Sequence, residues 1–315
     1  MVQKASILEK DDMVRVVAPA SSELDNPTEF GKGIAKLREL GFKVSLGDCV
    51  RKLKTLGYLS GSDRERAEEL NEAFRDDEVA AVFCATGGYG TPRMLPYVDY
   101  TLIKSKPKVF LGLSDITALH IAIHQKSDLV TFHGPMIISM GSQFSDYTEK
   151  CLIRAVTNPE PLGAVTNPID GPIIKTITDG TASGKLVGGN ISLLAATLGS
   201  SYEIDTKNKL LFVEEVDDPP YLIDRNLTAL SLADKLQDAA GIIVGEIVRS
   251  KPRENEASLS LWDMLRDRIG LTGKPAVYGF CFGHGTHHLT IPIGVEARLD
   301  ATQGTLWIEE NATEG

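Results

Sequence analysis

The sequence predicts an α/β protein whose first half contains a mostly parallel sheet covered by helices on both faces. Apolar runs typical of strands alternate there with amphipathic stretches typical of helices. Small or glycine-rich loops follow three of the predicted strands, at 18–22 (APASS), 86–90 (TGGYG) and 112–115 (GLSD). Ligands of parallel sheets bind beyond the C-terminal ends of the strands. These three loops are therefore the first candidates for a functional site.

The elements of the first half follow one another in a regular order. We predict strands at 13–18, 43–46, 79–84 and 109–111, and helices at 28–40, 62–75 and 116–125. Ser62 or Asp63 caps the second of these helices, because both residue types accept hydrogen bonds from the first turn. Strands that alternate with helices form parallel sheets, since each helix returns the chain to the same edge.

The composition changes at about residue 158, where prolines and glycines become frequent, and this predicts a linker over 158–179. We therefore expect a first domain at 1–157 and a second domain at 180–315. The second domain mixes predicted helices, at 189–198, 221–236 and 257–268, with shorter strands at 210–213, 241–244, 276–280, 289–293 and 305–308. This mixture is typical of a β-rich or α/β domain.

The overall charge argues against a nucleic-acid partner. The 315 residues carry a formal net charge of −10, and 42% of them are apolar. The nearest approach to a basic patch is the run 51–54 (RKLK) with Arg64 and Arg66. Acidic residues interleave the latter pair, so we interpret this region as solvated surface.

The cysteines and the N-terminus indicate the compartment. The cysteines are far apart and form no CxxC pair, which favours free thiols in a reducing compartment; they are Cys49, Cys84, Cys151 and Cys281. The first residues lack the apolar stretch of a signal peptide. The uncharged stretches 129–145 and 186–202 contain too many polar and glycine residues for a membrane span. We expect a cytoplasmic protein that does not bind a membrane.

Ser114 lies at the corner between the apolar run 109–111 and the next predicted helix. One interpretation is a helix N-cap, which Ser and Asp favour. The other is a nucleophile held at the rim of the sheet, with the backbone N–H of Asp115 available to an oxyanion. The stretch resembles the nucleophile elbow in its logic, but Ile116 replaces the second glycine of that motif. This stretch alone favours the cap.

The loop TGGYG at 86–90 brings two adjacent glycines to the end of a predicted strand. Glycine lets the backbone approach a ligand closely or adopt positive φ. A phosphate-binding loop is possible, but no GxGxxG motif or Walker lysine accompanies it. A tight turn is an equally good local interpretation, and a glycine N–H facing Ser114 is a candidate second oxyanion donor.

A serine nucleophile needs a histidine base. His284 lies between two glycines after the apolar run GFCF, and His133 also ends a predicted strand near the candidate site. His120 and His124 have a spacing that metal sites use, but the glutamate of HExxH is absent. We interpret them as packed or surface helix residues and expect no zinc site.

The base in turn needs an acid to orient it. Glu214 directly ends the apolar run LLFV, and a carboxylate in that position needs a partner such as a histidine N–H. The acidic residues that follow it are interpreted as a surface group: Glu215, Asp217 and Asp218.

Seven segments in order resemble the LD-carboxypeptidases, serine peptidases that include muramoyltetrapeptide carboxypeptidases and microcin C immunity peptidases. The resemblance covers nearly the whole chain, and the segments that carry it are YLSGSDRERAEELNEAF leading to FCATGGYGTPRMLPYVDY, then FLGLSDITAL, TFHGPM, GKLVGGNISLLAATLGSSYEID, LFVEEVDDPPYLIDR and GFCFGHGTHHLTIPIG. The resemblance implies a flavodoxin-like N-terminal domain, a smaller barrel-like α/β C-terminal domain and a homodimer.

The resemblance also implies a Ser–His–Glu triad of Ser114, His284 and Glu214, with the nucleophile in the first domain and its partners in the second. The site would then form at the domain junction. The implied oxyanion hole consists of the N–H groups of Asp115 and Gly88. No cofactor or metal is implied.

The implied reaction is removal of the C-terminal D-alanine from the L-centre of a diamino acid in a murein tetrapeptide. Gly87 and Arg225 are candidate substrate contacts, and Arg93 is a further candidate that we interpret as a structural ion pair. Thr86 and Leu113 depart from the arginine and the aromatic residue that the family often has there. These departures affect the expected substrate preference, not the triad.

Three alternatives remain at this stage. A microcin-type immunity peptidase would cleave a peptidyl-nucleotide, but Phe144 and Tyr147 are the only aromatic residues between Gly134 and Gly184, which favours the murein peptide. A two-domain binder without catalysis would not need all three triad residue types. A zinc hydrolase would lose its activity to a chelator.

Overall fold

The computed structural model describes residues 2–21, 26–51, 55–142, 144–254 and 257–315. The chain divides into two compact units. The first contains residues 1–160, 290–294 and 311–315, and the second contains residues 161–289 and 295–310. Residue 22 of the APASS loop and residues 52–54 of the RKLK run lie outside the described residues.

The first unit is built on a six-stranded sheet in the order β12-β5-β4-β3-β1-β2. Its strands are β1 (Met13–Val17), β2 (Lys43–Leu46), β3 (Val79–Cys84), β4 (Val109–Gly112), β5 (Thr131–His133) and β12 (Ile291–Ile293). All neighbouring pairs are parallel except β5 with β12. The central strands β3 and β4 are almost completely buried, as expected for a sheet that helices cover on both sides.

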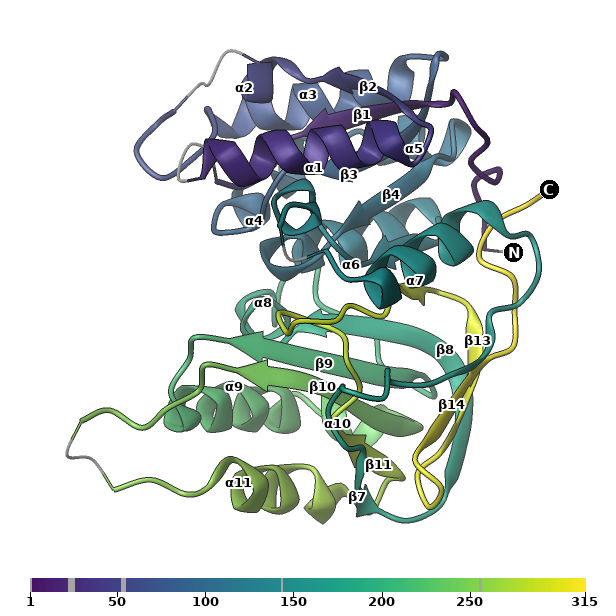
Figure 1. Cartoon of the computed structure of the whole chain (residues 1–315). Helices are drawn as coiled ribbons and strands as arrows, with labels where there is room; N and C mark the ends of the chain where they lie inside the picture. Colours follow the sequence, from purple (N-terminus) through teal and green to yellow (C-terminus); the bar gives the residue numbers. More distant parts are fainter. Residues whose placement is uncertain (1, 22–25, 52–54, 143, 255–256) are drawn as a thin grey trace. The chain divides into compact units, whose positions relative to one another are not determined.

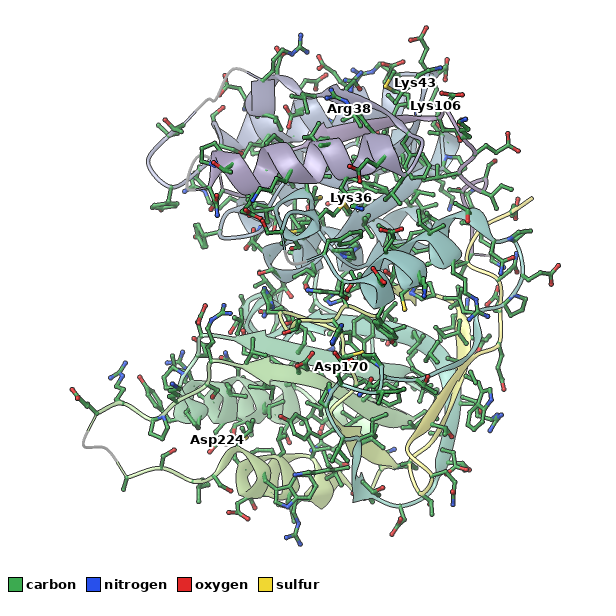
Figure 2. The ribbon with its side chains drawn as sticks, in the orientation of Figure 1. Lys36, Arg38, Lys43, Lys106, Asp170 and Asp224 are labelled. Carbon is green, nitrogen blue, oxygen red and sulfur yellow. The ribbon has the colours of Figure 1, made fainter. Side chains whose placement is uncertain are left out.

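Helices lie on both sides of this sheet (Figure 1). They are α1 (Pro27–Glu39), α2 (Asp48–Arg51), α3 (Asp63–Arg75), α4 (Thr91–Met94), α5 (Tyr100–Ser105), α6 (Thr117–Ser127) and α7 (Asp146–Thr157), with 3₁₀ turns η2 (Leu95–Tyr97), η3 (Ser114–Ile116) and η4 (Ile137–Met140). Ser62 begins α3 with a capping box that it shares with Glu65, which confirms one of the two predicted caps. Lys36 on α1, labelled in Figure 2, forms an ion pair with Glu149 on α7 at 3.4 Å.

The second unit is built on an eight-stranded mixed sheet in the order β6-β14-β13-β8-β9-β10-β11-β7. Its strands are β6 (Gly163–Val165), β7 (Lys175–Thr178), β8 (Thr181–Asn190), β9 (Leu210–Val216), β10 (Gly241–Val248), β11 (Ala276–Tyr278), β13 (Glu296–Asp300) and β14 (Thr305–Ile308). The four strands β8 to β11 are parallel, and the strands outside them pair antiparallel.

The second unit also contains α8 (Ile191–Ala196), α9 (Pro220–Leu232), α10 (Lys235–Asp238), α11 (Leu261–Arg268) and the 3₁₀ turn η5 (Gly270–Thr272). Helices α9 and α11 pack against each other, and Asp224 and Arg268 join them by an ion pair at 3.5 Å (Figure 2).

The observed organisation differs from the predicted one at three places. The proline-rich stretch 158–179 is not only a linker, because it supplies β6 and β7 to the edges of the second sheet. The ten-residue strand β8 was not predicted, since its glycines hide the strand pattern. The predicted strand at 289–293 returns to the first unit, where its apolar residues Ile291 and Ile293 pair with β5.

The cysteines and the helix lengths bear on two expectations from the sequence, free thiols and the absence of a membrane span. All four cysteines are free, and three of them are buried. Within the described ranges, no helix is both long enough and apolar enough to cross a membrane.

Candidate active site

Ser114 has a left-handed backbone, with φ of +67°, directly after strand β4. This conformation costs a non-glycine residue about 1–2 kcal/mol. Ser114 is the first residue of η3, the residue before it is the cap, and no side-chain hydrogen bond caps this turn. The cap interpretation is therefore wrong for the Ser114 hydroxyl. The backbone instead turns sharply there and leaves the side chain half-exposed.

Buried polar groups hold this corner in place. The His120 ring donates a hydrogen bond from Nε2 to the Gly112 carbonyl at 2.8 Å, one turn of α6 behind the corner. Burial lowers the pKa of His120 to about 4, so the ring is neutral at physiological pH. The Asp115 carboxylate accepts the Thr91 N–H at 2.7 Å and thereby ties the corner to the loop that follows β3. Burial raises the pKa of Asp115.

The two glycines of the 86–90 loop lie next to the corner. A Cβ atom on Gly87 would be 2.9 Å from the Ser114 Cβ and 3.1 Å from its Oγ, so only glycine fits there without displacing the serine. Gly88 has φ of +103°, and its N–H donates no hydrogen bond to any described residue. Ser21 also supports this loop, since its Oγ accepts the Tyr89 N–H at 3.2 Å.

Arg66 is completely buried, which corrects its assignment to the solvated surface. Its guanidinium donates to the carbonyls of Pro19, Gly61 and Gly90 and pairs with Asp63 at 2.5 Å. It therefore links the loop after β1 to the loop after β3. Burial lowers the pKa of Arg66, while the Asp63 carboxylate raises it.

In the second unit, His284 and Glu214 form a hydrogen-bonded pair. The His284 Nδ1 lies 2.7 Å from the Glu214 Oε2, and the Glu214 side chain is fully buried. Gly283 has φ of +108°, and a Cβ on it would come within 2.7 Å of the same carboxylate oxygen. The glycine before the histidine is therefore required for this approach. The expectation that Glu214 has a histidine partner is confirmed.

The pair changes the acid–base properties of His284. Burial alone would lower the pKa of His284, but the nearby Glu214 carboxylate outweighs it, and the pKa is raised. Because a carboxylate accepts the proton on Nδ1, the neutral ring presents Nε2 as the free base. The Ser114 corner belongs to the first unit, and this pair belongs to the second.

Glu215 is also buried, which corrects its interpretation as a surface residue. It lies on the opposite face of β9 from Glu214, because side chains alternate along a strand. Its carboxylate accepts the amide of Asn190 at 2.8 Å and the hydroxyl of Ser192 at 2.8 Å. Glu215 therefore anchors the start of α8.

Arg225 and Arg93, the two candidate substrate contacts with a positive charge, have different surroundings. Arg225 is exposed on α9. Arg93 pairs with Asp63 at 3.1 Å, which confirms the ion-pair interpretation. His120, His124 and His133 are buried in the first unit. Among the described residues, no group of His, Cys, Asp and Glu has the arrangement of a metal site.

Comparison with known families decides the class of this protein. Residues 14–134 match the LD-carboxypeptidase N-terminal domain, and residues 183–299 match the LD-carboxypeptidase C-terminal domain. The chain belongs to the LD-carboxypeptidase family. It is therefore a peptidase of the serine type.

Individual relatives agree with this membership. The chain is 43% identical to a probable murein peptide carboxypeptidase of Bacillus subtilis strain 168, over 99% of this chain and 96% of the relative. It is 30% identical to an MccF-like protein of Bacillus anthracis, with a TM-score of 0.85 over 97% and 99% of the two chains. A muramoyltetrapeptide carboxypeptidase from Oxalobacter formigenes has a TM-score of 0.82 at 25% identity, over 96% and 100% of the two chains.

Sequence reasoning missed the structural roles of two polar residues in this LD-carboxypeptidase, Arg66 and Ser21. It also missed Glu246, whose Oε1 is buried and accepts no hydrogen bond from any described residue. Arg66 lies one helical turn after the capping residue Ser62. Its neighbours in the sequence are acidic, and this pattern favours a position on the solvated surface. Ser21 lies in the candidate loop APASS, but the sequence pattern indicates no role for its hydroxyl. Glu246 lies in an apolar strand, and an isolated carboxylate in such a strand is the signal that was available.

Proposed function

We propose that the chain is an LD-carboxypeptidase that removes the C-terminal D-alanine from murein tetrapeptides by a Ser114–His284–Glu214 triad. The observation that carries the proposal is the buried Glu214 carboxylate on His284 Nδ1, which leaves Nε2 as a base. The name of the Bacillus subtilis relative supports the murein peptide as substrate.

In this proposal His284 Nε2 removes the proton of the Ser114 hydroxyl as Oγ attacks the carbonyl carbon before D-alanine. Glu214 holds the ring in the required tautomer and stabilises the imidazolium that forms. His284 then gives the proton to the nitrogen of the departing D-alanine. Water, activated by the same base, hydrolyses the acyl ester on Ser114 and restores the serine.

The oxyanion of the tetrahedral intermediate would be held by the N–H groups of Gly88 and Asp115. The close approach of Gly87 to Ser114 and the N–H of Gly88 that has no described acceptor support this assignment. One such donor typically lowers the barrier by about 3 kcal/mol. Gly87 would also line the space for the scissile carbonyl, whereas Arg225 is a weaker candidate for the substrate carboxylate.

The finer structural and cellular expectations belong to the same proposal. The order 2-1-3-4-5 of the first five strands supports a flavodoxin-like first unit. A barrel-like second unit has less support, because no described pairing joins β6 to β7. A cytoplasmic homodimer that requires no cofactor completes the proposal.

The experiment is incubation of the protein with L-Ala-γ-D-Glu-meso-diaminopimelate-D-Ala, followed by measurement of free D-alanine. The proposal expects release that EDTA does not affect and that Ser114→Ala eliminates while the protein remains folded. Release that a chelator stops would contradict the serine mechanism. Absence of release from this peptide and from its lysine analogue would contradict the substrate.

A microcin-type immunity peptidase is the second candidate, and the similarity to the MccF-like protein of Bacillus anthracis favours it. The same triad would cleave the amide of a peptidyl-nucleotide in that case. Incubation with an aminoacyl sulfamoyl adenosine distinguishes the two. A murein carboxypeptidase should release D-alanine on the order of 10⁴-fold faster than it releases the amino acid, the discrimination typical of a site built to hydrogen-bond its substrate.

A further inference from the structure

Strand β10 contains a bulge at Gly245 and Glu246. Val244 pairs with Val213 of β9, and Ile247 pairs with Glu215, so one extra residue stands on β10. The Glu246 N–H leaves the ladder with β9 and donates to the Phe282 carbonyl at 3.1 Å. Bulges redirect side chains beside functional sites. Here the bulge turns Glu246 toward the segment that carries His284.

The Glu246 carboxyl group packs directly against the residue that follows His284. A Cβ on Gly285 would lie 1.9 Å from Glu246 Oε1 and 2.5 Å from its Oε2. Any side chain at 285 would therefore displace the carboxyl group. Because residue 285 has no side chain, the Glu246 carboxyl group lies beside the residue next to the proposed base. The Glu214–His284 hydrogen bond remains in place.

The Glu246 carboxyl group forms no ion pair with any described residue. Its Oε1 is buried and accepts no hydrogen bond from any described residue. Burial raises the pKa of Glu246, and the charge of His287 only partly opposes this. His287 itself lies 3.4 Å from Asp170, a residue labelled in Figure 2. A buried carboxyl group without a donor is costly unless a ligand supplies one.

We propose that Glu246 binds the side-chain ammonium group of the residue whose carbonyl the enzyme attacks. This inference rests on the proposed function and names the substrate feature that the site selects. A group held one residue from His284 must lie close to the scissile bond. The leaving D-alanine has no side-chain cation. The ammonium of lysine or diaminopimelate, on the acyl side of that bond, satisfies the Glu246 carboxylate.

The test compares L-Ala-γ-D-Glu-L-Lys-D-Ala with the peptide that has norleucine in place of lysine, which removes the ammonium and keeps the chain length. We expect wild-type kcat/KM to be about 10- to 100-fold higher for lysine, the range for a hydrogen bond to a charged group. In Glu246→Gln this ratio should fall to about 1, because lysine loses its partner. The meso-diaminopimelate peptide should lose as much as the lysine peptide.

Two variants keep the test decisive. Glu296→Gln makes the same change at an exposed position on β13 and should keep the wild-type ratio. Glu246→Met fills the same space without a charge and should reproduce the loss of the ratio if the Gln variant folds poorly. Binding of the product L-Ala-γ-D-Glu-L-Lys to Ser114→Ala should weaken by a similar factor when Glu246→Gln is added.

Each other outcome overturns the inference. An equal loss for both peptides in Glu246→Gln would make Glu246 a positioning residue for the 284–287 segment. No loss for either peptide would remove Glu246 from the site. These results differ from failure of the proposed function, in which the wild-type protein releases D-alanine from none of the peptides.

Discussion

The Ser114 corner and the His284 loop reach their conformations by different means. At Ser114 the backbone carries the cost, since φ is +67° and neighbouring glycine and aspartate residues pack against the turn. At His284 the positive φ falls on Gly283, a glycine that adopts it without steric cost, and a buried carboxylate orients the ring at 2.7 Å. The proposed nucleophile is positioned by backbone and should tolerate few changes nearby, whereas the proposed base is positioned by a side chain and should depend on that one partner.

Loss of the Glu214 carboxylate, the partner of His284, should have the largest effect on turnover. We expect Glu214→Gln to lower kcat about 10³- to 10⁴-fold, because the amide no longer fixes the Nδ1–H tautomer or stabilises the imidazolium. The measurement is D-alanine release at saturating peptide. Glu215→Gln makes the same change on the opposite face of β9 and should reduce stability more than turnover. Equal losses of turnover in both variants would indicate a general effect of removing a buried carboxylate from this strand.

Crowding of the corner should have the next largest effect. A methyl group at Gly87 would lie 3.1 Å from Ser114 Oγ, where the attacked carbonyl must enter. Gly87→Ala should lower kcat/KM about 100-fold, the loss typical of a misplacement near 1 Å. Gly31→Ala is the control, since a Cβ there meets no atom within 4 Å, and it should leave kcat/KM unchanged. Wild-type activity in Gly87→Ala would show that the substrate does not pass this glycine.

The pH profile should show the effect of Glu214 on His284. The base must be neutral and its pKa is raised, so kcat/KM should rise with pH through a midpoint above 6.5. In Glu214→Gln that midpoint should move to lower pH. The stability that the pair contributes is complete below 6.5 and is lost as pH rises through the raised pKa. A midpoint that is the same in both proteins would assign the titration to another group.

Relief of backbone strain should have the smallest effect. Ser114→Gly should raise the free energy of unfolding by about 1 kcal/mol, because glycine adopts positive φ without a steric cost. Urea denaturation measures the change. Asn208→Gly is the control, since Asn208 has φ of +56° but asparagine tolerates this region, and its effect should be near zero. A less stable Ser114→Gly variant would mean that the corner stores no strain.

Much of the first sheet and of the candidate site could be predicted from the sequence. The alternation of apolar runs and amphipathic stretches predicted the first sheet, because its central strands β3 and β4 are buried on both faces. The pairing of Glu214 with a histidine followed from the cost of an unpartnered carboxylate at the end of an apolar run. The roles of Ser114 and His284 came from a resemblance across the chain, since each stretch alone also fitted a cap or a loop.

Other features depend on tertiary contacts that no local pattern encodes. Arg66 looks like a surface residue until three carbonyls from separate loops surround it. Strand β12 follows β11 in the chain but pairs in the other unit. The β10 bulge that redirects Glu246 is invisible in the strand pattern, because its position depends on the register with β9.

The central claim is that the Ser114 corner and the His284 loop act as one catalytic unit. The most direct measurement is kcat for D-alanine release by Ser114→Ala, His284→Ala and the double variant. Residues that act as a unit give non-additive losses, so the double variant should be no slower than Ser114→Ala, with each loss on the order of 10⁴- to 10⁶-fold. Losses that multiply in the double variant would contradict the account, since they would show two groups that act independently.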